Sequence, residues 1–159
     1  MFGFQRQTFA PSLHRIGAER SAECAEIHAE SFLHPWAEAD FEALLVAPET
    51  RAEGAIDAKS SRLIGFVLSK IAVDEAEILS IAVAPQWRKS GIGHAILASH
   101  IADLEASGVK ALFLEVDVEN HAARALYERF GFKPVGERKA YYRSADGGRA
   151  TALIMRKDL

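Results

Sequence analysis

Ile78–Phe132 reads ILSIAVAPQWRKSGIGHAILASHIADLEASGVKALFLEVDVENHAARALYERFGF, and this stretch decides the fold of the chain. Its apolar runs predict a strand at Ile78–Val83 and a second strand at Ala111–Val118. An amphipathic helix over Gly91–Ser107 lies between them, and another helix over Ala122–Phe130 follows. Because the second strand begins soon after the helix ends, this unit is a crossover that makes the two strands parallel.

The flanking sequence adds helices and strands on both sides of this unit. Helical spacing of apolar residues predicts one helix around Cys24 and another around Phe41, separated by His34-Pro35-Trp36. Alternating or continuous apolar runs predict further strands at Gly54–Ala58, Leu63–Val73, Lys133–Tyr142 and Ala150–Lys157, and they extend the first strand to Glu77–Val83. The fold class is therefore α/β (α+β), with a mixed, mostly antiparallel sheet and about four helices.

Length and composition limit the alternatives. The 159 residues predict a single domain, 1–159, in which residues 1–20 form an extension without a readable signal. A net charge of -3 argues against a surface that coats nucleic acid. The single cysteine, Cys24, excludes an intramolecular disulfide, and we expect a buried thiol and a cytoplasmic protein. No apolar run approaches the roughly 18 residues of a membrane-spanning helix, so we expect no membrane contact.

The turn Arg88–Gly93 is a candidate anion site. Gly91 and Gly93 allow backbone amides to approach a ligand closely, and the helix that starts there presents its positive end. The alternative is a tight turn whose glycines have a steric role only. A Walker A loop is excluded because no G-x-x-x-x-G-K-[ST] is present, and the dinucleotide fingerprint lacks its third glycine.

Glu115 stands out within its strand. Apolar side chains occupy one face, so Phe113, Glu115 and Asp117 share the other. A carboxylate in such a strand needs a partner or a chemical task, and partial burial would suit it to act as a general base. The alternative is a structural salt bridge on a half-exposed strand.

Asn120 and Tyr127 form a further candidate pair on the next helix. Asn120 is a good N-cap and could also contact a ligand through its amide. Tyr127 lies about two helical turns further on, where a phenol could give a proton to a departing thiolate. The alternative is that Tyr127 is a core aromatic residue beside Leu126 and Phe130.

Histidine chemistry is not indicated. The six histidines show no ligand spacing with a third partner nearby, so we expect no metal; they are His14, His28, His34, His94, His100 and His121. A Ser-His-Asp hydrolase is also disfavoured, because the G-x-S-x-G elbow is absent.

Taken together, these pieces resemble the GCN5-related N-acetyltransferase (GNAT) superfamily. The pieces are Ile81-Ala82-Val83-x-Pro85, Arg88-x-x-Gly91-x-Gly93, Leu114-Glu115-Val116, Asn120, Ala125-Leu126-Tyr127 and Gly131-Phe132. Three more are similar to the RimI-type ribosomal-protein-alanine N-acetyltransferases of that superfamily: His34-Pro35-Trp36, Arg138-x-x-Tyr141-Tyr142, and Ala145-Asp146-Gly147 before Ala152-Leu153-Ile154-Met155. The resemblance covers about Ser21 to Arg156 and implies a sheet that splays between its two central parallel strands.

The resemblance also implies a site and a reaction. Acetyl-CoA would be the acetyl donor, with Glu115 as the base, acting through water, and Tyr127 as the acid. Residues that match the cofactor-binding stretches are Ile81, Ala82, Val83, Arg88, Lys89, Ser90, Gly91, Ile92, Gly93, His94 and Asn120. Trp36, Tyr141 and Tyr142 would contact the acceptor, although packing as an aromatic lid is an equal alternative.

The implied acceptor is the N-terminal alanine amine of a ribosomal protein of the small subunit. The implied protein is a monomer or weak dimer that makes no direct contact with nucleic acid or membrane. Two other functions stay open at this point. One is acetylation of a small amine or a lysine side chain, and the other is a non-catalytic acetyl-CoA-binding sensor.

Overall fold

A computed structural model describes residues 11–143 and 149–159, with side chains for all of these except 140–143, 149 and 150. The strands, in chain order, are β1 (Ser12–Arg15), β2 (Thr50–Ile56), β3 (Leu63–Ala72), β4 (Glu75–Val83), β5 (Ala111–Asp117), β6 (Lys133–Arg143) and β7 (Arg149–Asp158). The α-helices are α1 (Ser21–Ala29), α2 (Glu38–Val46), α3 (Ile92–Ala106) and α4 (His121–Arg129). Short 3₁₀ turns, η1 (Ala18–Arg20) and η2 (Pro85–Trp87), precede α1 and α3.

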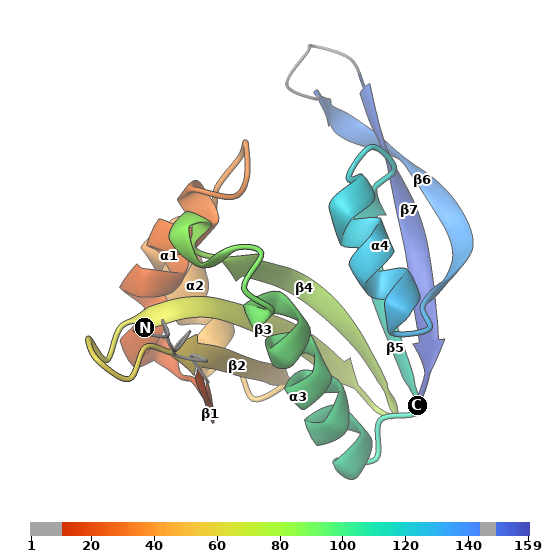
Figure 1. Ribbon diagram of the computed structural model, residues 1–159. Coiled ribbons are helices and arrows are strands. Elements are labelled where there is room, and N and C mark those ends of the chain that lie inside the picture. The colour runs from red at the N-terminus through yellow and green to blue at the C-terminus, as the bar shows by residue number, and fades with distance from the viewer. Residues whose placement is uncertain (1–10, 144–148) are drawn as a thin grey trace, which may run out of the picture.

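All of these strands join in one mixed sheet with the order β1-β2-β3-β4-β5-β7-β6 (Figure 1). Every neighbouring pair is antiparallel except β4 and β5, which are parallel because α3 crosses between them. The expected mixed sheet with two central parallel strands is therefore confirmed, as are the helices on either side of it. The first twenty residues held a strand that sequence reasoning missed, since β1 is only four residues long and pairs with the edge of β2.

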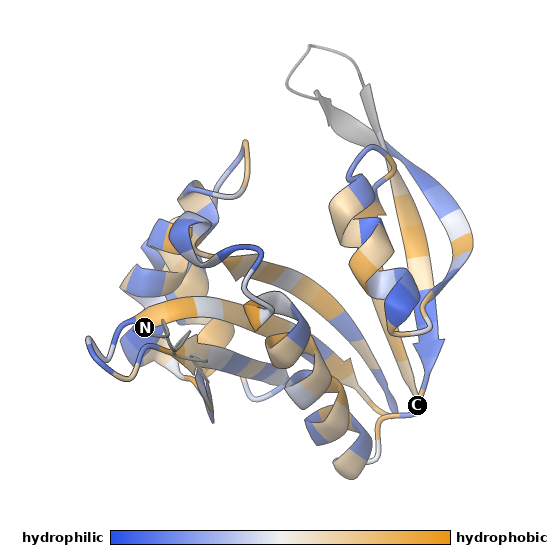
Figure 2. Cartoon of the chain, viewed as in Figure 1, coloured by the Kyte–Doolittle hydropathy of each residue, from blue (hydrophilic) through white to orange (hydrophobic). Residues whose placement is uncertain are grey.

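The apolar residues gather in two clusters, one on each face of the sheet. Side chains of α3, α4 and β5 form the larger cluster, which includes Ile96, Leu104 and Leu114. Side chains of α1, α2 and β3 form the other, around Phe41 and Phe66. Figure 2 shows the apolar residues along the central strands and on the inward sides of the helices. Thus α3 and α4 pack on one face of the sheet, whereas α1 and α2 cover the other face over β2, β3 and β4 and leave that face of β5 open.

Cys24 lies fully buried in α1, as the sequence predicted. Desolvation raises the pKa of its thiol to about 12, so the thiol stays protonated and unreactive at neutral pH.

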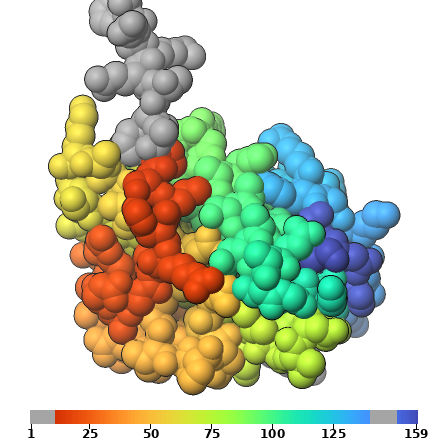
Figure 3. All heavy atoms as spheres, turned by 90° about the horizontal axis from the view of Figure 1, so that it is seen from below, coloured from red at the N-terminus to blue at the C-terminus, as the bar shows by residue number. Residues whose placement is uncertain are grey.

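Polar contacts fix α3 against the strands beneath it. Glu53 of β2 accepts hydrogen bonds from Ser99 of α3 (2.9 Å) and contacts Nδ1 of His100 (3.0 Å). The other ring nitrogen of His100 lies 2.6 Å from Oγ of Ser69 on β3. Toward the end of the helix, Asp103 pairs with Arg15 of β1, and Figure 3 shows the β1 segment against α3. These bonds satisfy groups whose burial would otherwise be costly.

Candidate active site

β4 and β5 part midway along their length. They are paired only from Glu75 against Ala111 to Ile78 against Leu114, although β4 continues to Val83 and β5 to Asp117. Figure 1 shows the two strands diverging from this point. The second half of β4 therefore presents a backbone edge that has no strand partner on its β5 side within the described residues, and such an edge can bond an extended ligand.

A β-bulge lies where the strands separate. Leu68 of β3 pairs with Ser80 of β4, but Ser69 pairs with Ile78, so Leu79 is an extra residue in β4. A bulge bends its strand and increases the local twist. The bend turns the second half of β4 away from β5, and it gives a physical cause for the splay that the sequence resemblance implied.

The two faces of the parted strands are chemically different. Strand alternation and the register place Ser80 and Ala82 of β4 on the α1/α2 face, together with Glu115 of β5. Ile81 and Val83 of β4 pack toward the other face, in the cluster formed by α3 and α4. The three β4 residues expected at the cofactor, Ile81, Ala82 and Val83, all lie beyond the last β4–β5 pair.

The turn before α3 has the open backbone of an anion site. Lys89 (φ 61°) and Gly91 (φ 84°) both adopt left-handed conformations, and Gly91 caps α3 without any side-chain hydrogen bond. A Cβ added at Gly91 would meet nothing within 4 Å, and one at Gly93 would meet only Val83, at 3.7 Å. Gly91 thus allows the left-handed backbone conformation of the turn. Its lack of a side chain also lets a ligand approach the free amides of the first turn of α3.

The side chains around this turn point in different directions. Lys89, Ser90 and His94 are exposed, whereas Ile92 is 2% exposed and belongs to the core. Ile92 can therefore offer a ligand only its backbone amide. The guanidinium of Arg88 donates to the carbonyl of Val83 (3.1 Å) and to Oγ of Ser31 (3.0 Å), so it ties the turn to the end of α1.

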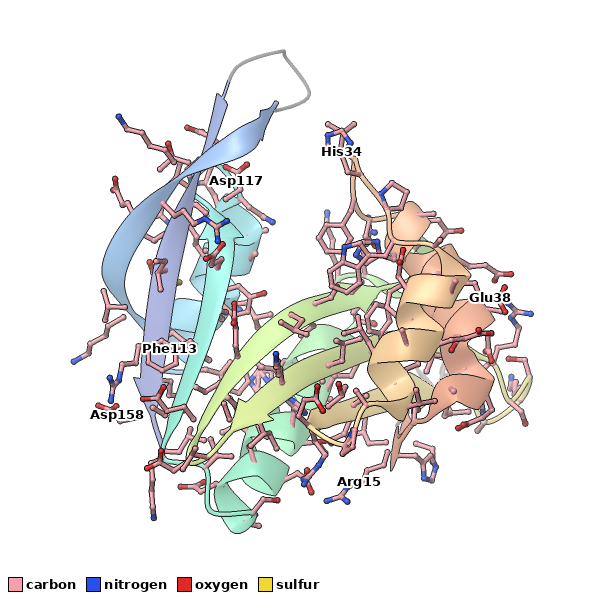
Figure 4. The ribbon with its side chains drawn as sticks, turned by 180° about the vertical axis from the view of Figure 1, so that it is seen from behind. Arg15, His34, Glu38, Phe113, Asp117 and Asp158 are labelled. Atoms are coloured by element: carbon pink, nitrogen blue, oxygen red, sulfur yellow. The ribbon has the colours of Figure 1, made fainter. Side chains whose placement is uncertain are left out.

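Glu115 is more exposed than its strand pattern suggested. Its side chain is 37% exposed, and Oε1 accepts a hydrogen bond from Nη1 of Arg138 at 3.2 Å. Figure 4 shows the open face of β5 on which Glu115 lies, with the labelled residues Phe113 and Asp117 on either side of it in sequence. A half-exposed carboxylate on an uncovered sheet face is accessible to an incoming amine.

Tyr127 is buried under the same strand on its other face. It is 6% exposed, packs edge-on against Phe132 with ring centroids 5.8 Å apart, and belongs to the cluster formed by α3 and α4. Burial raises the pKa of its phenol to about 12. The phenol is protonated at neutral pH, as an exposed tyrosine would also be, and this is the form that donates a hydrogen bond or a proton.

Asn120 and His94 make contacts at the first turns of α4 and α3, respectively. Asn120 caps α4, since its Oδ1 accepts from the amide of Ala123 at 3.2 Å, as its position predicted. The ring of His94 in the first turn of α3 lies 4.7 Å from the ring of Phe130 after α4. This contact joins the two helices across the diverging strands, and helical spacing alone gave no sign of it.

The residues expected at the acceptor lie on both sides of the parting. Trp36, in the α1–α2 connection, stacks on His28 with ring centroids 4.8 Å apart, and its amide donates to Nδ1 of His28 at 3.0 Å. Desolvation lowers the pKa of His28, which keeps this nitrogen free to accept. Tyr141 and Tyr142 belong to β6, but their side chains lie outside the described part of the chain. Figure 4 shows the α1–α2 connection, labelled at His34, opposite the β6–β7 hairpin.

One alternative chemistry, that of a hydrolytic triad, finds little support. Ser69, His100 and Glu53 form a contact series like that of a hydrolytic triad, but they are 0%, 0% and 5% exposed, so no substrate reaches them. Within residues 11–143 and 149–159, no three His, Cys, Asp or Glu side chains are grouped so as to hold a metal ion. In the same ranges no helix has the length and apolar character needed to cross a membrane.

Similarity to known proteins agrees with this geometry. The model of the acetyltransferase (GNAT) family matches residues 21–132. The [ribosomal protein bS18]-alanine N-acetyltransferases of Haemophilus influenzae and Escherichia coli K12 are 39% and 40% identical over 97 residues, 61% of this chain. The match spans 66% and 65% of those two proteins. A Bacillus subtilis relative is 37% identical over 131 residues, which are 82% of this chain and 83% of its own.

Solved structures extend the likeness to the whole fold. The crystal structure of the ribosomal-protein-S18-alanine N-acetyltransferase from Escherichia coli aligns with a TM-score of 0.86 and 30% identity, over 94% of each chain. Arabidopsis thaliana NAA60 in complex with acetyl-CoA aligns with a TM-score of 0.81 over 94% of this chain and 99% of its own. At 20% identity, this second likeness is one of fold alone.

Proposed function

This chain belongs to the acetyltransferase (GNAT) family, and we propose that it transfers the acetyl group of acetyl-CoA to the N-terminal α-amine of a protein. The observation that carries the proposal is the parting of β4 and β5 after Ile78 and Leu114, with the open glycine turn at the end of β4. Together they provide an unpaired strand edge next to a site for phosphate groups.

The residues present fit acetyl-CoA, which would supply the acetyl group as a thioester. Backbone groups of Ile81–Val83 would bond the extended arm of the cofactor, as a neighbouring strand would. The free amides of residues 91–94 and the charge of Lys89 would hold the pyrophosphate. Open space beside the α-carbon of Gly91 supports this assignment, because a side chain there would stand in the way.

Two side chains of the site could transfer protons in this reaction. Glu115 would take a proton from the acceptor amine, directly or through water, because its half-exposed carboxylate lies on the uncovered face. Tyr127 would give a proton to the departing thiolate from the other face, since its phenol carries a proton at neutral pH. Backbone amides on the free edge of β4 would stabilise the negative charge that develops on the carbonyl oxygen.

We propose that the acceptor is the N-terminal alanine of a small-subunit ribosomal protein. The names of the Haemophilus influenzae and Escherichia coli relatives support this choice. The chemistry supports it too, because an α-amine with a pKa of about 8 is roughly 10% neutral at pH 7, against well under 0.1% for a lysine near 10.4. A carboxylate as exposed as Glu115 therefore suffices as the base.

The proposal is tested in two steps on the purified full-length chain. Calorimetric titration with acetyl-CoA should detect binding, and its absence would overturn the cofactor assignment. Release of coenzyme A is then measured with a peptide beginning Ala-Arg, with the same peptide blocked at its N-terminus, with an internal-lysine peptide and with a polyamine. We expect turnover with the free N-terminus alone; preference for the polyamine or the lysine would reassign the acceptor, and no turnover with any amine would leave a binding protein.

A further inference from the structure

Among the described ion pairs, Arg138 is the partner of the proposed base, and nothing in the local sequence of Glu115 points to it. It lies on β6, separated from β5 by β7, and its Nη1 donates to Oε1 of Glu115 at 3.2 Å. The register explains how the two residues meet. Arg138 pairs with Ala152, which pairs with Asp117, so Arg138 and Glu115 lie on the same face one row apart.

The sheet leaves room for Arg138 to lie across β7. Ala152, the β7 residue in its path, is small and 4% exposed, so a long side chain can pass over its methyl group. Asp117, the other carboxylate on this face of β5, already accepts a hydrogen bond from the amide of Glu119 at 2.9 Å. The guanidinium consequently reaches past Asp117 to Glu115, which lies nearer the point where the strands separate.

The exposure of this ion pair speaks against a purely structural role. Arg138 is 62% exposed and Glu115 is 37% exposed, and ion pairs as open to water as this one contribute little to folding stability. The pair lies on the part of the α1/α2 face formed by β5, β7 and β6, where none of the described apolar residues of α1 and α2 pack. Figure 4 shows this part of the face at the labelled residue Asp117, opposite the α1–α2 connection. A solvent-exposed guanidinium beside the candidate base should therefore affect the charge state of a bound acceptor more than the stability of the fold.

We infer that Arg138 is a positioning residue for the proposed reaction: it orients the Glu115 carboxylate toward the acceptor, and its positive charge favours the neutral form of the amine that docks there. The inference rests on the proposed function, since it takes Glu115 as the base. The physical reason is that a like charge within a few ångströms disfavours protonation of an amine, whereas an unopposed carboxylate would favour it. Arg138 thus offsets the tendency of Glu115 to hold the acceptor as an unreactive ammonium.

The other described charged groups on or facing this surface make no described ion pair with Glu115. Arg156 of β7 is occupied, with its guanidinium 5.2 Å from the ring centroid of Phe113 and its Nε bonded to Asp158 at 2.9 Å. Further charged or titratable residues with described side chains on this face, or across from it, include Asp117, Lys133, Glu77, Lys70 and His34. Among the described ion pairs, Arg138 is the cation that bonds Glu115.

The test compares pH profiles of turnover at saturating acetyl-CoA and saturating acceptor peptide. The variants are Arg138→Met, which removes the charge, and Arg138→Lys, which keeps it. Lys139→Met is the matched control, because Lys139 is the exposed neighbour on the same strand whose register places it on the opposite face. Arg138→Met and Lys139→Met each remove one positive charge from the protein. Any effect of overall charge on the pH profile should therefore be the same in these two variants.

We expect the ascending limb of kcat, which reports the bound amine, to move to higher pH by about half a unit to one unit in Arg138→Met. Turnover at pH 7 then falls about three- to tenfold, while the KM for the peptide stays level or decreases. Arg138→Lys should restore most of the limb, and Lys139→Met should leave it in place.

An unmoved limb in Arg138→Met, or an equal movement in Lys139→Met, would overturn the inference while leaving the proposed function intact. A wild-type protein that acetylates no amine would overturn the proposed function itself. If the wild type prefers a small amine, the same three variants assayed on that amine give the same decision about Arg138.

Discussion

Glu115 and Tyr127 flank β5 from its two faces: the carboxylate lies on the uncovered face that looks toward the α1–α2 connection, and the phenol lies beneath α4 in the core. Strand alternation separates them, and the pairing of β4 with β5 ends at Leu114, the residue before Glu115. In the proposed reaction, the acceptor and the leaving group would therefore be served from opposite faces of β5. Because they lie on opposite faces, each of the two proposed proton-transfer groups can be substituted separately.

Removing the carboxylate should slow turnover in a pH-dependent way. In Glu115→Gln we expect kcat at pH 7 to fall by about 10²-fold, because a base in this position contributes that much or more. The loss should shrink as the pH rises toward 9, where the acceptor amine deprotonates in solution. Glu77→Gln is the control, since Glu77 is an exposed carboxylate on the same face of the neighbouring strand. An equal loss at pH 7 and pH 9 would argue that Glu115 acts in another way.

Removing the phenol should affect the chemical step and spare cofactor binding. In Tyr127→Phe we expect kcat to fall by about 10²-fold while the affinity for acetyl-CoA, measured by calorimetry, stays within about twofold. The ring still fills its place in the core beside Phe132, so the free energy of unfolding should change by about 1 kcal/mol or less. Unchanged kcat would reduce Tyr127 to a core aromatic residue.

The glycine turn should show separate effects on folding and on binding. Gly91→Ala places a side chain at φ 84°, which should lower the free energy of unfolding by about 1–2 kcal/mol and weaken acetyl-CoA binding. Gly108→Ala is the matched control, because Gly108 has φ 90° at the other end of α3 and equally open surroundings.

Urea unfolding and calorimetry distinguish the two variants. Both should lose similar stability, and only Gly91→Ala should lose affinity for the cofactor. Gly91→Asn should recover part of the stability, because asparagine tolerates the left-handed region, without recovering the affinity. Equal affinity in all three variants would place the pyrophosphate elsewhere.

The titration of His28 should make the folded protein less stable in mild acid. The pKa of His28 is lowered by desolvation in the folded state, so between its ordinary value near 6.5 and that lower value the unfolded chain binds more protons. The free energy of unfolding contributed by His28 is therefore fully present above about pH 6.5 and is lost as the pH falls further. His28→Asn keeps an oxygen to accept from the amide of Trp36 and does not titrate, so its stability should change less between pH 7 and pH 5. Equal slopes in urea titrations would contradict this role.

The local sequence carried enough information to place most elements. The predicted helix at Gly91–Ser107 is α3 (Ile92–Ala106), and the predicted strand Ala111–Val118 is β5 (Ala111–Asp117). These segments have strong periodicity and clear end signals, such as the positive φ that Gly108 supplies after α3. β1 was missed because four residues are too few to show a period, and it becomes a strand only by pairing with β2.

The sequence alone determined the order of the elements, the parallel pair at their centre and the residue types available for chemistry, because these depend on periodicity and on neighbours in the chain. Tertiary structure decided the rest. The bulge at Leu79 and the end of pairing after Ile78 depend on three strands at once, and the pairing of Glu115 with Arg138 joins residues on strands separated by β7. Exposure of Glu115 and burial of Tyr127 follow from which faces the helices cover, a property of the assembled sheet rather than of any one segment.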